Sequence, residues 1–280
     1  MDQYLDMLET VRLKGVPKRQ RAVPLSTGTR PMALSVFGMQ TSYPLHDTFP
    51  IVTTKKVSFR IIAEELIWLL SGSDNVRPLQ ERGVHIWDEW ADPETGDLGH
   101  TYGKQWRRWA AADGTEWDQI DHLVRNIRSV VADPESPHGR RLILSSWNPP
   151  EVHLSRGPVG CHTMAQFDVT RGKLSCHLTS RSTDLLIGAP YNISSYALLT
   201  CLLAKVCGLR PGTFVHSIGD AHIYENHLPQ VDEQLSRRPM PLPYLELDKS
   251  IREVSDFKSA SQAVLVGYTC HEALKAEVAV

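Results

Sequence analysis

The clearest hydrophobic pattern in the chain is helical and runs from Ser58 to Gly72. At 100° per residue one face is apolar, while Arg60 and Glu64 fall on the opposite face. Ser58 suits an N-cap and Gly72 suits the end of the helix. Glu65 falls in the middle of the apolar face, where a carboxylate is costly unless it is paired, neutralised or used. The pattern therefore predicts a core helix whose Glu65 is either a satisfied structural group or a functional one. The apolar face consists of Ile61, Ile62, Leu66, Trp68 and Leu69.

A second pattern alternates between apolar and polar residues from Thr163 to Leu178, interrupted by Arg171-Gly172. This is typical of a β-hairpin with a two-residue loop. Counting back from that loop places Cys161 opposite Ser182 and beside Arg181. A β-bulge would shift this register by one residue, so the pattern predicts neighbourhood rather than a specific contact.

Residues 184–195 (DLLIGAPYNISS) contain Gly188, Pro190 and Asn192 just before an apolar stretch, Tyr196–Leu209. The first segment is expected to form a tight turn leading into a helix, and the second a core helix. Strand patterns interleaved with helix patterns predict a mixed α and β architecture. The chain shows no internal repeat and no long linker, which predicts one continuous domain.

The charges of the 280-residue chain nearly balance, with 30 Lys and Arg against 32 Asp and Glu. A net charge of -2 gives no overall electrostatic case for binding nucleic acid or a membrane surface. Residues Met1–Arg12 contain acids and no uninterrupted apolar run, so we expect a cytoplasmic protein without a secretory signal. The stretch Tyr196–Leu209 is too short to span a bilayer.

Five cysteines are widely spaced along the chain and odd in number, which predicts free thiols. Cys161 lies in the segment GPVGCH, at the predicted start of a strand. A thiol becomes nucleophilic when nearby cations lower its pKa, and the hairpin register brings Arg181 close. An inert, half-buried cysteine is the plainer interpretation of the chemistry alone. His162 points to the opposite face of the strand, so a Cys-His protease pair is weakly supported.

Three further features each have a functional and a structural interpretation. Arg140 and Arg141 precede an apolar strand and suit a phosphate, or else form a solvated positive edge. The block His85–Trp109 holds four of the seven tryptophans, which suit either a flat ligand or the core. The histidines of His222–His227 lack the spacing of a zinc site, so no metal is expected.

Taken together, these segments resemble the folate-dependent thymidylate synthase family over nearly the whole chain. The resemblance implies an α+β fold with a large mixed β-sheet and flanking helices, forming a dimer through the sheet face, with residues 1–280 as a single catalytic domain. It rests on FPIVTTKK (Phe49–Lys56), the Glu65 helix, IWDEWAD, GDLGHTYGKQWR, RRLILSSWN, GCH, LSCHLTSRSTDLLIGAPYNISSYALL, GDAHIYENH and the terminal VAV.

The resemblance also implies catalytic roles. Cys161 matches the nucleophile that adds to C6 of a pyrimidine and makes C5 reactive toward the methylene of 5,10-methylenetetrahydrofolate. Glu65 matches a proton-handling carboxylate, and Tyr102 matches a residue implicated in removing the C5 proton. Asn192 matches the amide that reads the base, because an amide complements the N3-H donor and O4 acceptor of uracil. Because this amide can also be oriented the other way round, cytosine stays an alternative base.

Binding roles follow from the same resemblance. Arg181 and Ser182 match phosphate ligands, and Arg140 and Arg141 match arginines that reach the phosphate of the partner subunit. His222 and Tyr224 match groups on the sugar 3′-hydroxyl. The remaining matches form the folate pocket and the tail that closes over it. These are Ile86, Trp87, Trp90, Asp184, Gly188 and the terminal residues around Ala279.

The chain departs from the family pattern around the nucleotide. The usual RTGTGT phosphate loop is replaced by STGTRPMA (Ser26–Ala33), in which Arg30 is a shifted substitute for the loop arginine or phosphate binding is altered. Gly160 and Ser180 stand where Pro and Gln are usual, and Glu277 stands where the tail usually has Pro. Substrate identity is therefore the least determined property.

The leading expectation is reductive methylation of dUMP to dTMP. The alternative is a (d)UMP or (d)CMP 5-hydroxymethylase in a specialised nucleotide-modification pathway, in which water rather than a hydride reaches the transferred carbon. Retained Trp87 and the nearly family-like tail favour hydride transfer, whereas the charge of Glu277 favours water. A silent nucleotide- or RNA-binding relative is disfavoured, because a pure binder needs no buried carboxylate beside a thiol.

Overall fold

The computed structural model describes residues 1–20, 31–157 and 160–277. Its centre is a six-stranded mixed sheet in the order β1-β2-β8-β7-β6-β5, in which β7 and β8 are parallel and the other pairs antiparallel. The expected α+β class with a large mixed sheet is therefore confirmed. The strands are β1 (Val16–Arg19), β2 (Met32–Pro44), β5 (Ile143–Ser145), β6 (His162–Thr170), β7 (Lys173–Asp184) and β8 (Arg210–Tyr224).

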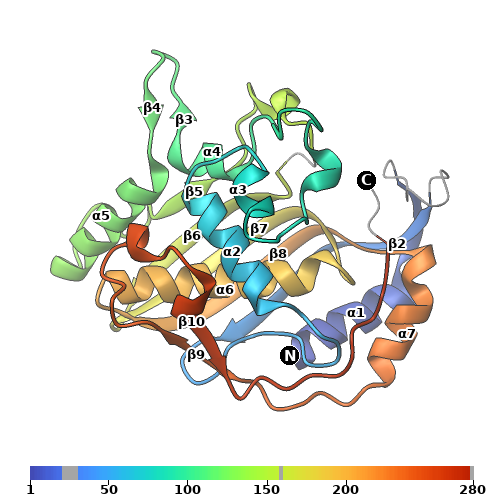
Figure 1. Ribbon diagram of the computed structural model, residues 1–280. Helices are drawn as coiled ribbons and strands as arrows, with labels where there is room; N and C mark the ends of the chain where they lie inside the picture. Colours follow the sequence, from blue (N-terminus) through green and yellow to red (C-terminus); the bar gives the residue numbers. More distant parts are fainter. Residues whose placement is uncertain (21–30, 158–159, 278–280) are drawn as a thin grey trace.

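Helices flank this sheet, and two small hairpins lie outside it (Figure 1). The hairpins are β3 (Trp109–Ala110) with β4 (Glu116–Trp117) and β9 (Tyr244–Leu247) with β10 (Ala263–Val266). The helices are α1 (Asp2–Lys14), α2 (Phe59–Leu70), α3 (Arg77–Gln80), α4 (Tyr102–Arg107), α5 (Gln119–Ala132), α6 (Gly188–Val206) and α7 (Leu228–Ser236). In the described part of the chain, no helix combines the length and apolarity needed to cross a bilayer.

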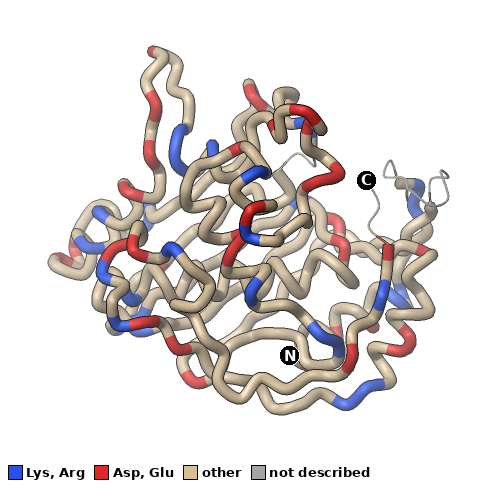
Figure 2. Tube along the Cα trace, in the orientation of Figure 1, with Lys and Arg blue, Asp and Glu red and all other residues tan. Residues whose placement is uncertain are grey.

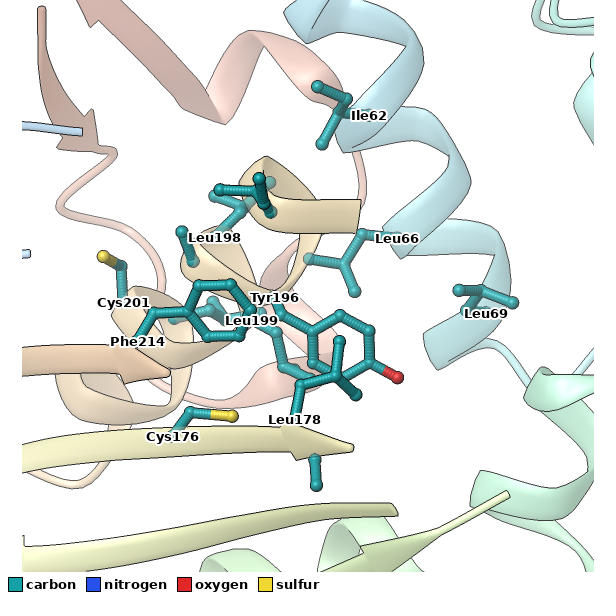
Figure 3. Close-up of a cluster of buried hydrophobic side chains, with 14 of the residues drawn as sticks. Ile62, Leu66, Leu69, Cys176, Leu178, Tyr196, Leu198, Leu199, Cys201 and Phe214 are labelled. Carbon is teal, nitrogen blue, oxygen red and sulfur yellow. The ribbon is translucent and has the colours of Figure 1, made fainter. Parts of the chain in front are cut away.

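The core lies where α2 and α6 pack over the sheet. In Figure 3 the α2 side chains Ile62, Leu66 and Leu69 point toward α6. Tyr196 of α6 stacks on Phe214 of β8 with 6.3 Å between ring centroids. Apolar side chains that share one helical face are buried together because this removes them from water.

The predicted helix at residues 58–72 is confirmed as α2, with Ser58 at the N-cap position. One detail of the predicted faces was wrong. Glu64 is buried at 8% exposure rather than solvated, and its carboxylate accepts a hydrogen bond of 2.6 Å from Arg82 Nη1. Ile61, on the predicted apolar face, is partly buried and packs against the core. The burial of Glu64 follows from the C-terminal segment, whose Ala260 N–H contacts Glu64 at 3.4 Å and which covers the side expected to face water.

The predicted hairpin is confirmed as β6 and β7, joined by Arg171 and Gly172 with φ of 52° and 70°. Its far end differs from simple counting. The register shifts between His162 and Met164, so Cys161 faces Arg181 rather than Ser182. This is the one-residue effect of a β-bulge. The consequence is that the backbone N–H of Arg181 donates to the Cys161 carbonyl at 2.8 Å.

The apolar helix is confirmed as α6, but it begins earlier than expected. Gly188, Pro190 and Asn192 lie in its first turns rather than in a preceding turn. The Asp184 carboxylate explains this start, because it accepts the backbone N–H of Leu186 at 2.9 Å and that of Ile187 at 3.3 Å. The chain therefore turns from β7 directly into the helix.

The two faces of the sheet differ in burial. Alternate residues of β7 on one face are fully buried under the helices, such as Cys176 and Leu178. Ser175, His177 and Thr179, on the other face, are only partly buried. Lys and Arg residues are interspersed with Asp and Glu residues along the trace (Figure 2).

Candidate active site

The site is built around the thiol of Cys161, which immediately precedes β6 and is a free cysteine, as are the other four. The Arg181 guanidinium holds the loop and the thiol together. Its Nε donates to the Gly160 carbonyl at 3.2 Å, and its Nη2 lies 3.6 Å from Cys161 Sγ. Burial raises the pKa of this thiol, whereas Arg181 and a hydrogen bond from Tyr102 act to lower it. The cation and the hydroxyl therefore favour the thiolate in a site that otherwise disfavours charge.

Tyr102, the first residue of α4, is fixed against the same loop. Its hydroxyl oxygen accepts the backbone N–H of Cys161 at 2.7 Å. The backbone N–H of His162 also hydrogen-bonds to this hydroxyl. Burial raises the pKa of Tyr102 far above its usual value, so the phenol keeps its proton. Because the oxygen is occupied as an acceptor, the O–H is free to donate toward the sulfur.

Glu65 reaches this site from α2. Its Oε1 accepts the indole N–H of Trp87 at 2.8 Å, and the Trp87 ring lies 6.2 Å from that of Tyr102. Burial raises the pKa of Glu65 to about 7, and the Trp87 hydrogen bond opposes this rise only in part. A carboxyl group that titrates near neutral pH suits both donation and acceptance of a proton.

Asn192 joins the site through His162. The amide hydrogen-bonds to the His162 side chain, which packs between Tyr102 and Tyr196 with ring centroids 5.1 and 5.2 Å away. Burial lowers the pKa of His162 to about 4, so its ring is neutral at pH 7. A neutral imidazole has one donor and one acceptor nitrogen, so it can bond either the oxygen or the nitrogen of the Asn192 amide.

The carboxyl ends of the parallel strands β7 and β8 form the remaining wall. Register pairs Ser182 with Asp220 and Asp184 with His222. His222 is buried beside Asp220, with Nδ1 3.6 Å from a carboxylate oxygen, and neighbouring carboxylates raise the pKa of His222 although burial opposes this. The His222 and Tyr224 rings lie 5.2 Å apart. Hydroxyl, imidazole and phenol groups thus line a polar edge.

Comparison with known families identifies the family of the chain. A sequence model of thymidylate synthase matches residues 2–280. The chain belongs to the thymidylate synthase family. It is therefore a transferase whose family joins a folate cofactor and a pyrimidine nucleotide in one-carbon transfer to C5.

Trp87 and Trp90, which match the family's folate pocket, lie on the Glu65 side of the site. Trp87 contacts Trp68 and Trp90 with ring centroids 5.8 and 5.7 Å apart, so the indoles form a continuous aromatic wall. Ile86, beside it, is 37% exposed. A Cβ placed on Gly188 would lie 3.9 Å from that of Asp184, so these two residues adjoin. Flat aromatic faces next to a carboxylate fit a folate ring system.

Other predicted site residues are not brought together in one chain. Arg140 and Arg141 are exposed, and within the described residues neither guanidinium has a hydrogen-bond or ion-pair partner. Arg30 and Ala279 lie outside the described residues. Among the residues that are described, no group of His, Cys, Asp and Glu has the geometry of a metal site.

Two side chains next to the site were not predicted from the sequence. Lys55 is buried, donates to the Leu186 carbonyl, and burial lowers its pKa to about 8. Trp147 places its ring 5.9 Å from the Arg181 guanidinium carbon. Both residues lie in segments that carry the family resemblance, FPIVTTKK and RRLILSSWN, but periodicity did not show which group each would meet.

Proposed function

We propose that the protein methylates C5 of dUMP to give dTMP, using 5,10-methylenetetrahydrofolate and Cys161 as the nucleophile. The observation that carries this proposal is the convergence of the Arg181 guanidinium and the Tyr102 phenol on the Cys161 thiol, with the titratable carboxyl group of Glu65 nearby. A single catalytic domain over residues 1–280 and a cytoplasmic location complete the proposal.

The first step is addition of the Cys161 thiolate to C6 of the uracil ring. The C5–C6 electron pair moves toward C4 and O4, which makes C5 a carbon nucleophile. Arg181, with Nη2 3.6 Å from the sulfur, stabilises the thiolate. Tyr102 stabilises the same charge by donating its O–H, while its own oxygen is held by backbone N–H groups.

Asn192 is proposed to read the base. Its carbonyl oxygen would accept the N3-H of uracil and its NH₂ would donate to O4. The hydrogen bond to the neutral His162 ring supports a restrained position for the Asn192 side chain. Glu65, with a pKa of about 7, is proposed to move the proton that O4 and the cofactor exchange during the reaction.

The phosphate and sugar are proposed to lie along the ends of β7 and β8. Arg181 and Ser182 would bind the phosphate, and His222 and Tyr224 the 3′-hydroxyl. Arg140 and Arg141 would serve the site of the partner subunit, since both are exposed and unpaired in their own described chain. The half-exposed sheet face supports a dimer that covers it, with Ser175, His177 and Thr179 on it.

The folate supplies the one-carbon unit and, for methylation, the hydride. Trp87, Trp90 and Ile86 would hold its ring system, while Asp184 would accept hydrogen bonds from it beside Gly188. The tail around Ala279 would close the pocket and exclude water. Water exclusion matters because water at the transferred carbon gives a hydroxymethyl product.

The decisive experiment incubates the protein with 5,10-methylenetetrahydrofolate and each of dUMP, UMP, dCMP and CMP. We expect dUMP to gain CH₂ with formation of dihydrofolate, as measured by mass spectrometry and absorbance. A gain of CH₂O without dihydrofolate would replace methylation by hydroxymethylation. Reaction of a cytosine nucleotide alone would overturn the role given to Asn192.

Covalent capture tests the nucleophile separately. We expect 5-fluoro-dUMP with the folate to label Cys161, and the Cys161→Ser protein to remain unlabelled. If no nucleotide labels the unmodified protein, a silent nucleotide-binding relative is the better description.

A further inference from the structure

The Arg181 guanidinium is held by more than the catalytic residues, since its Nε donates to the Gly160 carbonyl at 3.2 Å. It is exposed to solvent, and long exposed side chains lose rotamer freedom when they are held in one position. Yet it must keep Nη2 close to Cys161 Sγ for the thiolate to form. Contacts that restrict the Arg181 side chain to this rotamer therefore determine how much of the time its guanidinium lies next to the Cys161 sulfur.

Trp147 lies on the far side of this guanidinium. The Arg181 guanidinium carbon sits 5.9 Å from the centre of the Trp147 ring, within the range of a cation–π contact. Both side chains border an open cavity of about 340 Å³, together with Ser145, Thr163 and Met164. The Arg181 guanidinium and the Trp147 ring are therefore neighbours at the border of this cavity.

The backbone of Trp147 is itself fixed from both sides. Ser146 Oγ accepts the indole N–H of Trp106 at 2.8 Å, and Asn148 Nδ2 donates to Gln105 Oε1 at 3.2 Å. Gln105 and Trp106 belong to α4, the helix that begins with Tyr102. The Trp147 N–H also contacts the Thr163 carbonyl at 3.3 Å, at the bulge that sets Cys161 opposite Arg181. One helix thus places both Tyr102 and Trp147 around the thiol.

We infer that Trp147 is a positioning residue, whose ring face holds the Arg181 guanidinium against Cys161. The inference rests on the proposed function only for its catalytic meaning, because the effect on the thiol can be measured without turnover. Arg181 acts to lower the pKa of the Cys161 thiol. Loss of the Trp147 ring should therefore raise that pKa and leave less thiolate at a given pH.

The test measures alkylation of Cys161 by iodoacetamide across pH, following the Cys161 peptide by mass spectrometry. We expect Trp147→Leu to slow alkylation about two- to five-fold below the thiol pKa, as an exposed cation–π contact implies. Trp147→Phe, which keeps an aromatic face, should fall between this variant and the wild type. Partial unfolding would expose the thiol and speed the reaction, so a slower rate cannot come from lost structure.

Two further variants make the result specific. Trp117→Leu removes a tryptophan that is 50% exposed on the β3–β4 hairpin and should leave alkylation unchanged. Arg181→Ala should slow alkylation more than Trp147→Leu, and the double variant should match Arg181→Ala alone. The inference is overturned if Trp147→Leu matches the wild type, if Trp147→Phe is as slow as Trp147→Leu, or if the double variant shows an added effect.

Covalent capture separates the two claims. If the wild type fails to bind 5-fluoro-dUMP covalently while Trp147→Leu slows alkylation, the proposed function fails and the positioning role stands. If 5-fluoro-dUMP labels the wild type and Trp147→Leu is alkylated as fast as the wild type, the proposed function stands and the positioning role fails.

Discussion

At the scale of single residues, Glu65 shows how burial converts an ordinary carboxyl group into a proton carrier. It shares a helix face with the apolar residues Ile62, Leu66 and Leu69. Among the described residues, its hydrogen-bond donor is the neutral indole of Trp87 rather than a cation. Its neighbour Glu64 is paired with Arg82. Of these two adjacent carboxylates, Glu64 has a compensating positive charge beside it and Glu65 has a neutral donor instead.

The Glu65 titration should be visible in stability. Between about pH 4.5 and 7 the folded protein holds a Glu65 proton that the unfolded chain has released, so stability falls as pH rises through this range. The Glu65→Gln variant lacks this loss. As pH rises through this range, we expect its free energy of unfolding to increase relative to that of the wild type by up to about 1.4 kcal/mol per pH unit. Urea unfolding at pH 5, 6 and 7 measures this gain.

The control for this prediction is Glu89→Gln, which changes an exposed carboxylate in the segment that follows Trp87. The gain of Glu65→Gln is compared with the effect of this surface substitution. If the difference between Glu65→Gln and the wild type stays constant from pH 5 to 7, Glu65 is ionised throughout and is not the proton carrier.

At the scale of elements, the ion pair of Glu64 with Arg82 ties α2 to the chain that covers it. Arg82 Nη1 also donates to the Lys258 carbonyl at 3.0 Å, and Glu64 accepts from Ala260. Arg82→Met should destabilise the protein by about 1–3 kcal/mol, because it leaves a buried carboxylate with too few donors. Thermal and urea unfolding provide the measurement.

Adding Glu64→Leu to Arg82→Met should recover most of this loss, because no buried charge then remains unpaired. If the double variant is less stable than Arg82→Met alone, packing rather than charge explains the contact.

The β6–β7 turn sets the register that leads to Cys161. Gly172 has φ of 70° and nothing within 4 Å of a Cβ placed on it, so Gly172→Ala tests backbone strain alone. We expect a loss of about 1–2 kcal/mol in the free energy of unfolding. Gly139→Ala, with ordinary φ and its nearest atom at 3.6 Å, is the matched control and should change stability little. Equal losses of stability for Gly172→Ala and Gly139→Ala would mean that the positive φ of Gly172 does not explain the effect.

At the scale of the whole molecule, the site is incomplete in one chain if Arg140 and Arg141 bind the phosphate across a dimer. Mixing Cys161→Ser protein with Arg141→Ala protein should then restore part of the activity, because one site of each hybrid has both residues intact. Methylation rates after subunit exchange, with hybrids verified by native mass spectrometry, measure this. Verified hybrids without activity would mean that each site comes from one chain.

Several features followed from the sequence alone, because they depend on local periodicity. The α2 helix, the β6–β7 turn and the core helix α6 each repeat with the period of their own backbone. The conflict at Glu65 was also visible, since a helical wheel needs no partner to reveal a carboxylate on an apolar face. The family resemblance then supplied roles for residues distant in sequence.

Only the tertiary structure decided the contacts that depend on non-local packing. The bulge that turned Cys161 toward Arg181 arises from strand pairing, which alternation cannot reveal because a one-residue shift keeps the same turn. Burial of Glu64 depends on a segment almost 200 residues away. Trp147 likewise meets Arg181 only once β5 and β6 pair and α4 fixes the backbone on both sides of the indole. Hydrophobic periodicity reflects the local backbone conformation, whereas the chemistry of these groups depends on the distant residues that the fold places beside them.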